Sequence, residues 1–140
     1  MAGRYGMSFA KKHIEEGEYD EAVRVATEEI DAGAASPESF VDRATALDLL
    51  ERHEESVSDF ERALELDREA KELTVEDVDD AYFSALASAA MKLAATDARA
   101  GVALLERYAK VLPAGRHLAD VADWKKRVTG ELQSTLDKTT

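Results

Sequence analysis

Apolar residues recur along this chain three and four positions apart, with charged residues between them. This spacing places the apolar side chains on one face of a helix, so the pattern predicts amphipathic helices. The stripe formed by Phe9, Ala10, His13 and Ile14 is one example. Seven helices are predicted, over about residues 5–16, 19–32, 37–51, 55–69, 75–95, 97–111 and 116–136.

Local signals mark where several of these helices begin and end. Gly17 follows the first helix and is free to take the positive φ that commonly ends one. Ser36 is an N-cap residue, and Pro37 stands at the first helical position, where its missing N–H costs nothing. Asp97 caps the helix that follows it. These signals predict helix boundaries at all three places.

The long helix over 75–95 differs from the others in composition. Thr74 with Asp77 three residues on predicts a capping box at its start. From Tyr82 to Ala95 the helix is apolar nearly all round, with one narrow polar line. A helix of that kind is normally buried on most faces, so we expect it to lie inside the fold.

The segment from Gly17 to Asp67 contains the same helical pattern twice, 34 residues apart. Small or apolar residues occupy most of the matched positions. The pairs are Ala22 with Ser56, Ala26 with Phe60, and Glu29 with Ala63. A period of 34 that encloses a helix, a turn and a second helix is typical of an α-helical repeat array.

The stretch ESVSDFERALELD resembles the second helix of a tetratricopeptide repeat, and Leu112–Pro113 supplies the proline that closes such a unit. The first-helix consensus is not met: Phe40 takes the place of its tryptophan. Alanine (Ala10, Ala44) replaces its glycine, and His13 and Leu47 replace its tyrosine. The resemblance covers roughly residues 5–113. It implies an all-α fold, a right-handed α-solenoid of about three helix-turn-helix units with a C-terminal capping helix.

We therefore expect residues 1–140 to form a single helical domain. Its units are predicted at about 5–34, 37–69 and 75–113, and its capping helix at about 116–136. In that last helix Leu118, Val121, Trp124, Val128 and Leu132 share one side. End repeats need such a helix to cover their exposed apolar flank.

The resemblance also implies a concave groove, lined by the first helix of each unit, that receives a peptide or a partner helix. The lining positions are Arg4, Met7 and Lys11 in the first unit, Glu38, Val41, Thr45 and Asp48 in the second, and Phe83, Leu86 and Ala90 in the third. This set lacks the lysines and asparagine with which some members of the family clamp a terminal carboxylate, which Glu38 and Asp48 would repel.

Two interpretations remain for Phe83, Leu86 and Ala90. Left exposed, they would form a contiguous apolar patch of the kind that marks an interaction surface. Alternatively, the acidic segment before them and the helix of Trp124 fold back and cover them, as expected for side chains so apolar.

The net charge of −12 narrows the range of partners. It argues against nucleic acid and anionic membranes, both of which need clustered lysine and arginine. Residues 1–80 hold 24 acidic and 9 basic residues, whereas residues 81–140 hold 6 and 9. Solvated helix faces explain such an imbalance. The more specific explanation is an acidic face for a basic partner, or head-to-tail contact between copies.

The expected cellular compartment is inferred from three features that the sequence lacks. There is no cysteine, which fits a reducing compartment. The stretch MAGRYGMSFAKK has no apolar run after its positive charge, so we expect no signal peptide. No segment approaches the roughly 20 apolar residues of a membrane span. We expect a cytoplasmic protein.

Motifs for chemistry are missing from the sequence. His13, His53 and His117 are spread over different units and form no metal-binding pattern. Asp77, Asp79 and Asp80 lack the glycine and the glutamate of a calcium-binding loop. We expect no enzyme activity, no metal and no cofactor. The sequence favours a non-catalytic protein-binding module, with a self-assembling scaffold, head-to-tail or dimeric, as the alternative.

Overall fold

The computed structural model describes residues 9–71, 73 and 75–139, with the backbone alone at 34, 70, 75–77 and 131–139. These residues form seven α-helices and one π-helical turn. The predicted all-α class is confirmed. None of the helices in these ranges has the length and apolar character needed to cross a membrane.

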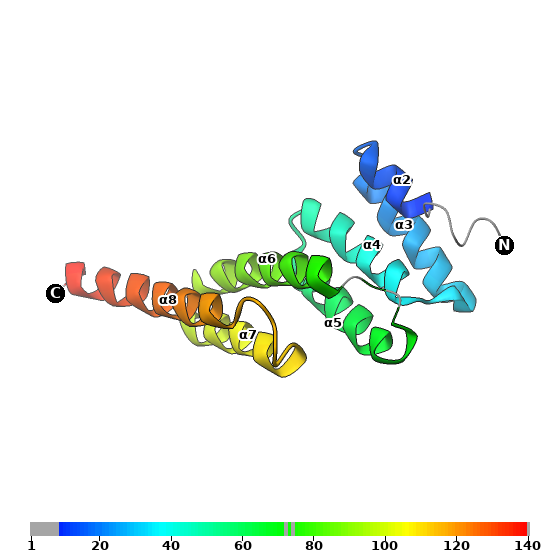
Figure 1. Ribbon diagram of the computed structural model, residues 1–140. Helices are drawn as coiled ribbons and strands as arrows, with labels where there is room; N and C mark the ends of the chain where they lie inside the picture. The colour runs from blue at the N-terminus through cyan, green and yellow to red at the C-terminus, as the bar shows by residue number, and fades with distance from the viewer. Residues whose placement is uncertain (1–8, 72, 74, 140) are drawn as a thin grey trace. The chain divides into compact units, whose positions relative to one another are not determined.

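The chain divides into two compact units, Met1–Val78 and Asp79–Thr140. In the first unit the elements are α2 (Phe9–Glu15), α3 (Tyr19–Glu29), the π-helical turn η1 (Ile30–Ala34), α4 (Pro37–Leu49) and α5 (His53–Ala70). Helix α2 packs on α3, α3 on α4, and α4 on α5 (Figure 1). Each helix therefore contacts its predecessor, as the short connections predict.

The predicted breaks near Gly17 and Gly33 and the predicted start at Pro37 are confirmed, whereas α4 ends at Leu49 and not at Glu51, which has a positive φ, and α5 begins at His53 and not at about Glu55. Gly17 has a φ of +79° directly after α2, and Gly33 has a φ of +84° where the second helix breaks off. The Ser36 hydroxyl accepts a hydrogen bond of 3.2 Å from the Ser39 N–H, and Pro37 begins α4. The part of the first predicted helix before Phe9 lies outside the described residues.

The turns after α2 and after α4 follow the same backbone path, 34 residues apart. The N–H of Glu18 donates to the carbonyl of His13 at 2.8 Å, and the N–H of Arg52 donates to that of Leu47 at 2.8 Å. Glu51, the counterpart of Gly17, also has a positive φ, of 61°. The repetition seen in the sequence is therefore also a repetition of backbone geometry.

The core between the helices repeats in the same way. Ala10 and Ala44 are fully buried on α2 and α4, and Ala22 and Ser56 are fully buried on α3 and α5. The Ser56 hydroxyl donates a 2.7 Å hydrogen bond to the main-chain carbonyl of Ala44. Small residues at these matched positions let consecutive helices approach closely.

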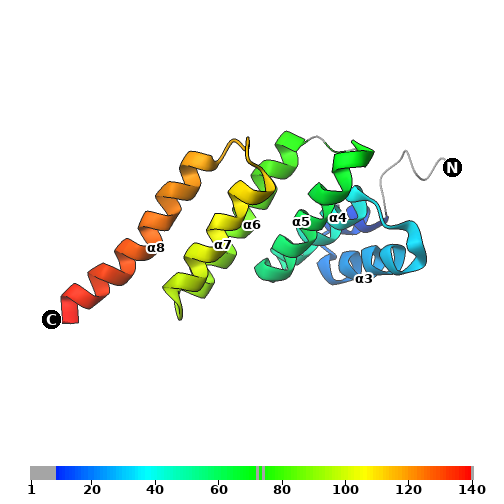
Figure 2. The same ribbon diagram turned by 90° about the horizontal axis from the view of Figure 1, so that it is seen from below.

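The second unit contains most of α6 (Val75–Ala94), α7 (Ala98–Val111) and α8 (Leu118–Thr139). Figure 2 shows these three helices one beside the next. At Gly101 of α7 an added Cβ would lie 2.7 Å from the main-chain oxygen of Ala90 on α6, so only glycine fits this approach. The Asp97 carboxylate accepts from two N–H groups at the start of α7, which confirms the predicted cap. Thr74 of the predicted capping box lies outside the described residues.

The connection between α7 and α8 is tied to the start of α6 by a buried polar cluster. The Tyr108 hydroxyl donates to Asp79, whose other carboxylate oxygen accepts from the Arg116 N–H at 2.9 Å. The same hydroxyl accepts from the His117 N–H at 3.0 Å. Burial, together with the hydrogen bond to Asp79, raises the pKa of Tyr108, so the phenol stays protonated.

Candidate partner-binding surface

The predicted groove residues on α4 form a half-buried stripe. Val41, Thr45 and Asp48 are spaced by four and three positions, which places them on one side of the helix. The Thr45 hydroxyl donates to the Val41 carbonyl at 2.8 Å, so it is satisfied within the helix. One oxygen of Asp48 lies 2.6 Å from Nδ1 of His53, and this contact fixes the carboxylate.

Two further predicted positions flank this stripe. Glu38 is exposed in the first turn of α4, and Lys11 is exposed on α2, which contacts α4. Arg4 and Met7 lie outside the described residues. The accessible or half-accessible groove positions are therefore on α2 and α4.

The three predicted positions on α6 are buried. Leu86 and Ala90 have no exposed surface, and Phe83 has 9%. The ring of Phe83 is stacked on that of His117, with the centroids 4.5 Å apart and 4° between the planes. Ala90 faces the close approach of Gly101. Of the two interpretations, the structure favours coverage over an exposed patch.

The residue that covers Phe83 differs from the one expected. His117 belongs to the connection before α8, whereas Trp124 lies about two turns further along, within that helix. Trp124 is half-buried, and the guanidinium of Arg127 lies 4.9 Å from the centroid of its ring. His117 is held in turn by Asp80, 2.7 Å from Nε2, and by Asp120, 2.8 Å from Nδ1. The stacked pair is therefore part of the cluster at the start of α6.

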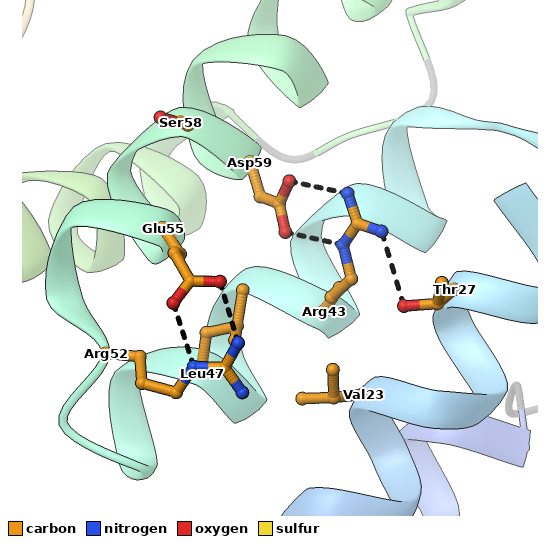
Figure 3. A pocket seen from close by; sticks show the side chains of 8 residues that line it. All are labelled: Val23, Thr27, Arg43, Leu47, Arg52, Glu55, Ser58 and Asp59. Carbon is orange, nitrogen blue, oxygen red and sulfur yellow. Dashed lines mark hydrogen bonds and ion pairs between the residues drawn. The ribbon is translucent and has the colours of Figure 1, made fainter.

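A pocket of about 350 Å³ opens between α3 and α5, with α4 beneath it (Figure 3). Arg43 and Leu47 of its lining lie on the opposite side of α4 from the stripe, because two residues along a helix span about 200°. The lining residues are Val23, Thr27, Arg43, Leu47, Arg52, Glu55, Ser58 and Asp59.

The charges in this pocket are paired. Arg43 forms two hydrogen bonds to Asp59, at 2.7 and 2.9 Å, and reaches Thr27 at 3.3 Å (Figure 3). The Asp59 hydrogen bonds raise the pKa of Arg43 and outweigh the opposing effect of burial. Arg52 forms a second two-point pair with Glu55, at 2.9 and 2.7 Å. Val23 and Leu47 are the apolar residues of the lining, and Leu47 is only 3% exposed, so the accessible wall of the pocket is mainly polar.

Sequence reasoning did not single out this pocket. The ion pair of Arg52 with Glu55 could have been predicted, because residues three positions apart on a helix lie close together. Arg43 and Asp59 belong to different helices, and nothing in a single sequence pairs them.

One group of possible metal ligands lies on the turn between α2 and α3. His13, Glu16 and Glu18 each place a ligand atom within 4.8 Å of the other two. A hydrogen bond from His13, and a second involving Glu16, lower the pKa of Glu18. From the sequence we expected no metal site, because the three histidines are spread over different units and form no metal-binding pattern.

No family model, curated protein or solved structure matches this chain. The function is therefore inferred from the residues of the chain and their geometry.

Proposed function

We propose that this protein is a non-catalytic interaction module of the tetratricopeptide type. Its concave side, formed by the first helices of a right-handed array of helix pairs, binds a peptide or a helix of another protein. The observation that carries this proposal is the repeated turn geometry, with matching hydrogen bonds at Glu18 and at Arg52, 34 residues apart. A period of 34 with a helical pair inside it is the hallmark of that repeat class.

The half-buried stripe of Val41, Thr45 and Asp48 supports a binding role for α4. A partner side chain placed against Val41 would bury apolar surface, while Asp48 would favour a basic neighbour. Glu38 adds a second negative charge on the same helix. The acidic excess over residues 1–80 supports a basic partner through long-range attraction.

A second candidate function is a self-assembling scaffold. Phe9 on the first described helix is 74% exposed, and Leu118 at the start of the last one is 40% exposed. Large apolar side chains exposed on the terminal helices, together with opposite charge excesses in the two halves, support contact between copies. Heterologous contact of this kind builds rings or open filaments.

The binding proposal is tested with a displayed library of helical peptides selected on the intact protein. We expect basic amphipathic sequences to be enriched. Calorimetry with a selected peptide should give at least about tenfold weaker binding for Val41→Arg and for the exposed Glu38→Lys. Ser58→Arg on the pocket side is the control and should bind as the wild type does. Unchanged binding by both α4 variants contradicts the proposal.

The scaffold candidate is tested by sedimentation velocity across a salt series. Charge-driven assembly gives oligomers that dissociate as salt rises, because exposed charges are screened. Replacing Phe9 by Ser should weaken assembly as well. A monomer at every salt concentration excludes this candidate and leaves the binding proposal standing.

A further inference from the structure

The turn between α2 and α3 brings one imidazole and two carboxylates together. Nδ1 of His13 lies 2.7 Å from a carboxylate oxygen of Glu18, and Glu16 completes a group whose ligand atoms are all within 4.8 Å. The main chain holds this arrangement, since the Glu18 N–H donates to the His13 carbonyl at 2.8 Å. Gly17, with its positive φ, reverses the chain between the two glutamates.

These donors match the requirements of a late first-row divalent cation. Imidazole nitrogen with carboxylate oxygen suits Zn²⁺, whereas Mg²⁺ and Ca²⁺ take oxygen ligands almost alone. Zinc binds both donor types at about 2.0–2.2 Å, which places ligand atoms about 3.4 Å apart in a tetrahedron. Glu16 and Glu18 are exposed, so rotation of their side chains can close the remaining distance.

The second copy of the same turn shows that the backbone does not require these donors. There Leu47, Leu50 and Arg52 stand at the positions of His13, Glu16 and Glu18, and the corresponding main-chain hydrogen bond has the same length. The donor set is therefore a property of the first turn's side chains and not a by-product of forming the turn.

We propose that His13, Glu16 and Glu18 form a surface site for Zn²⁺ with three protein ligands. The metal takes the place of the proton between His13 and Glu18, and a water molecule or a donor from a partner protein fills the fourth position. Three-ligand zinc sites commonly keep such an open position. The excess of carboxylates over residues 1–80 attracts a dication to this part of the chain.

The test uses the full chain, stripped with a chelator and titrated with Zn²⁺ alone by calorimetry. We expect one Zn²⁺ per chain, with Mg²⁺ unable to compete at millimolar concentration. Histidine ring resonances recorded during the titration should shift for His13 and stay in place for His53 and His117. Absence of zinc binding, or a shift centred on another histidine, overturns the proposal.

Three variants locate the site. His13→Leu with Glu18→Arg copies the second turn, should keep its helix content, and should weaken binding by at least about tenfold. Glu16→Gln leaves the His13–Glu18 pair in place and should also weaken binding. His53→Leu is the matched control, because His53 lies 2.6 Å from the Asp48 carboxylate but belongs to no group of three candidate ligands among the residues that the structure describes. Equal zinc affinity in wild type and the Glu16 variant, or equal losses in the His53 control, contradicts the assignment.

Discussion

Arg43 on α4 and Asp59 on α5 form a two-point ion pair, with nitrogen–oxygen distances of 2.7 and 2.9 Å, that ties the two helices together. Their side chains are only 22% and 10% exposed. Removing one partner leaves the other charge partly buried without its counter-charge. We predict that Asp59→Ala lowers the free energy of unfolding by about 2–4 kcal/mol, measured by urea denaturation.

The control for this prediction lies on the same helix. Glu65 pairs with Arg62 at 3.3 Å, and both side chains are more than half exposed. Glu65→Ala makes the same change in net charge but should alter stability by less than about 0.5 kcal/mol. Similar losses in the two variants would show that net charge, and not the buried pair, determines the effect.

Ser56 tests the repeated core of the first unit. It is fully buried at the position that Ala22 occupies 34 residues earlier, so the space accepts alanine. Ser56→Ala removes one hydrogen bond and should cost about 1 kcal/mol. Ser56→Leu overfills the site and should cost about 3 kcal/mol, seen as an earlier urea midpoint. Equal stability of the two variants would contradict close packing between the helices at this position.

Two helical glycines in the second unit should respond to alanine in opposite ways. At Gly101 a Cβ would meet the Ala90 carbonyl oxygen at 2.7 Å, so Gly101→Ala should lower stability by about 1–3 kcal/mol. At Gly130 nothing lies within 4 Å, so Gly130→Ala should raise it by about 0.5–1 kcal/mol through helix propensity. Thermal unfolding measures the stability of both variants. Higher stability of Gly101→Ala than of the wild type would refute the close packing of α6 and α7.

His117 should make the second unit less stable as the pH rises above neutrality. Burial lowers its pKa, but hydrogen bonds to Asp80 and Asp120 raise it and prevail, so the folded pKa lies above the ordinary 6.5. The stabilisation is fully present below the unfolded pKa and is lost as pH rises through the raised folded value.

Fluorescence of Trp124, the single tryptophan of the chain, follows this effect because it lies in α8. The thermal midpoint of unfolding followed by this fluorescence should be highest below pH 6.5 and should fall as the pH rises through the raised folded pKa of His117. His117→Gln should flatten that dependence while leaving Asp80 and Asp120 in place. The same slope in this variant would assign the effect to another group.

Local features of the fold were predictable because they depend on neighbouring residues. Ser36 and Pro37 specify the start of α4, Asp97 caps α7, and Gly17 ends α2, each through contacts within a few positions. The match between sequence segments 34 residues apart likewise predicted that the helix-turn-helix unit is repeated. The structure bears out these helix boundaries.

The candidate surface was only partly predictable, because burial depends on residues distant in the chain. Phe83 is covered by His117, whose place over that ring follows from the anchoring of the α7–α8 connection by Asp79 and Asp80. The pocket depends on the pairing of Arg43 with Asp59 across two helices. Neither the stacking of His117 on Phe83 nor the pairing of Arg43 with Asp59 can be predicted from the spacing of residues in the sequence. The grouping of His13, Glu16 and Glu18 was not predicted, because it depends on the reversal of the backbone at Gly17, which brings the three side chains together.

The central claim is that the side of α4 that carries Val41, Thr45 and Asp48 receives a partner chain. Amide chemical-shift mapping with a selected peptide tests it most directly, because it reports contact residue by residue. The account predicts the largest shifts at these three residues and at Lys11, with Thr27 and Ser58 on the pocket side little changed. Shifts concentrated at Thr27 and Ser58 would contradict it.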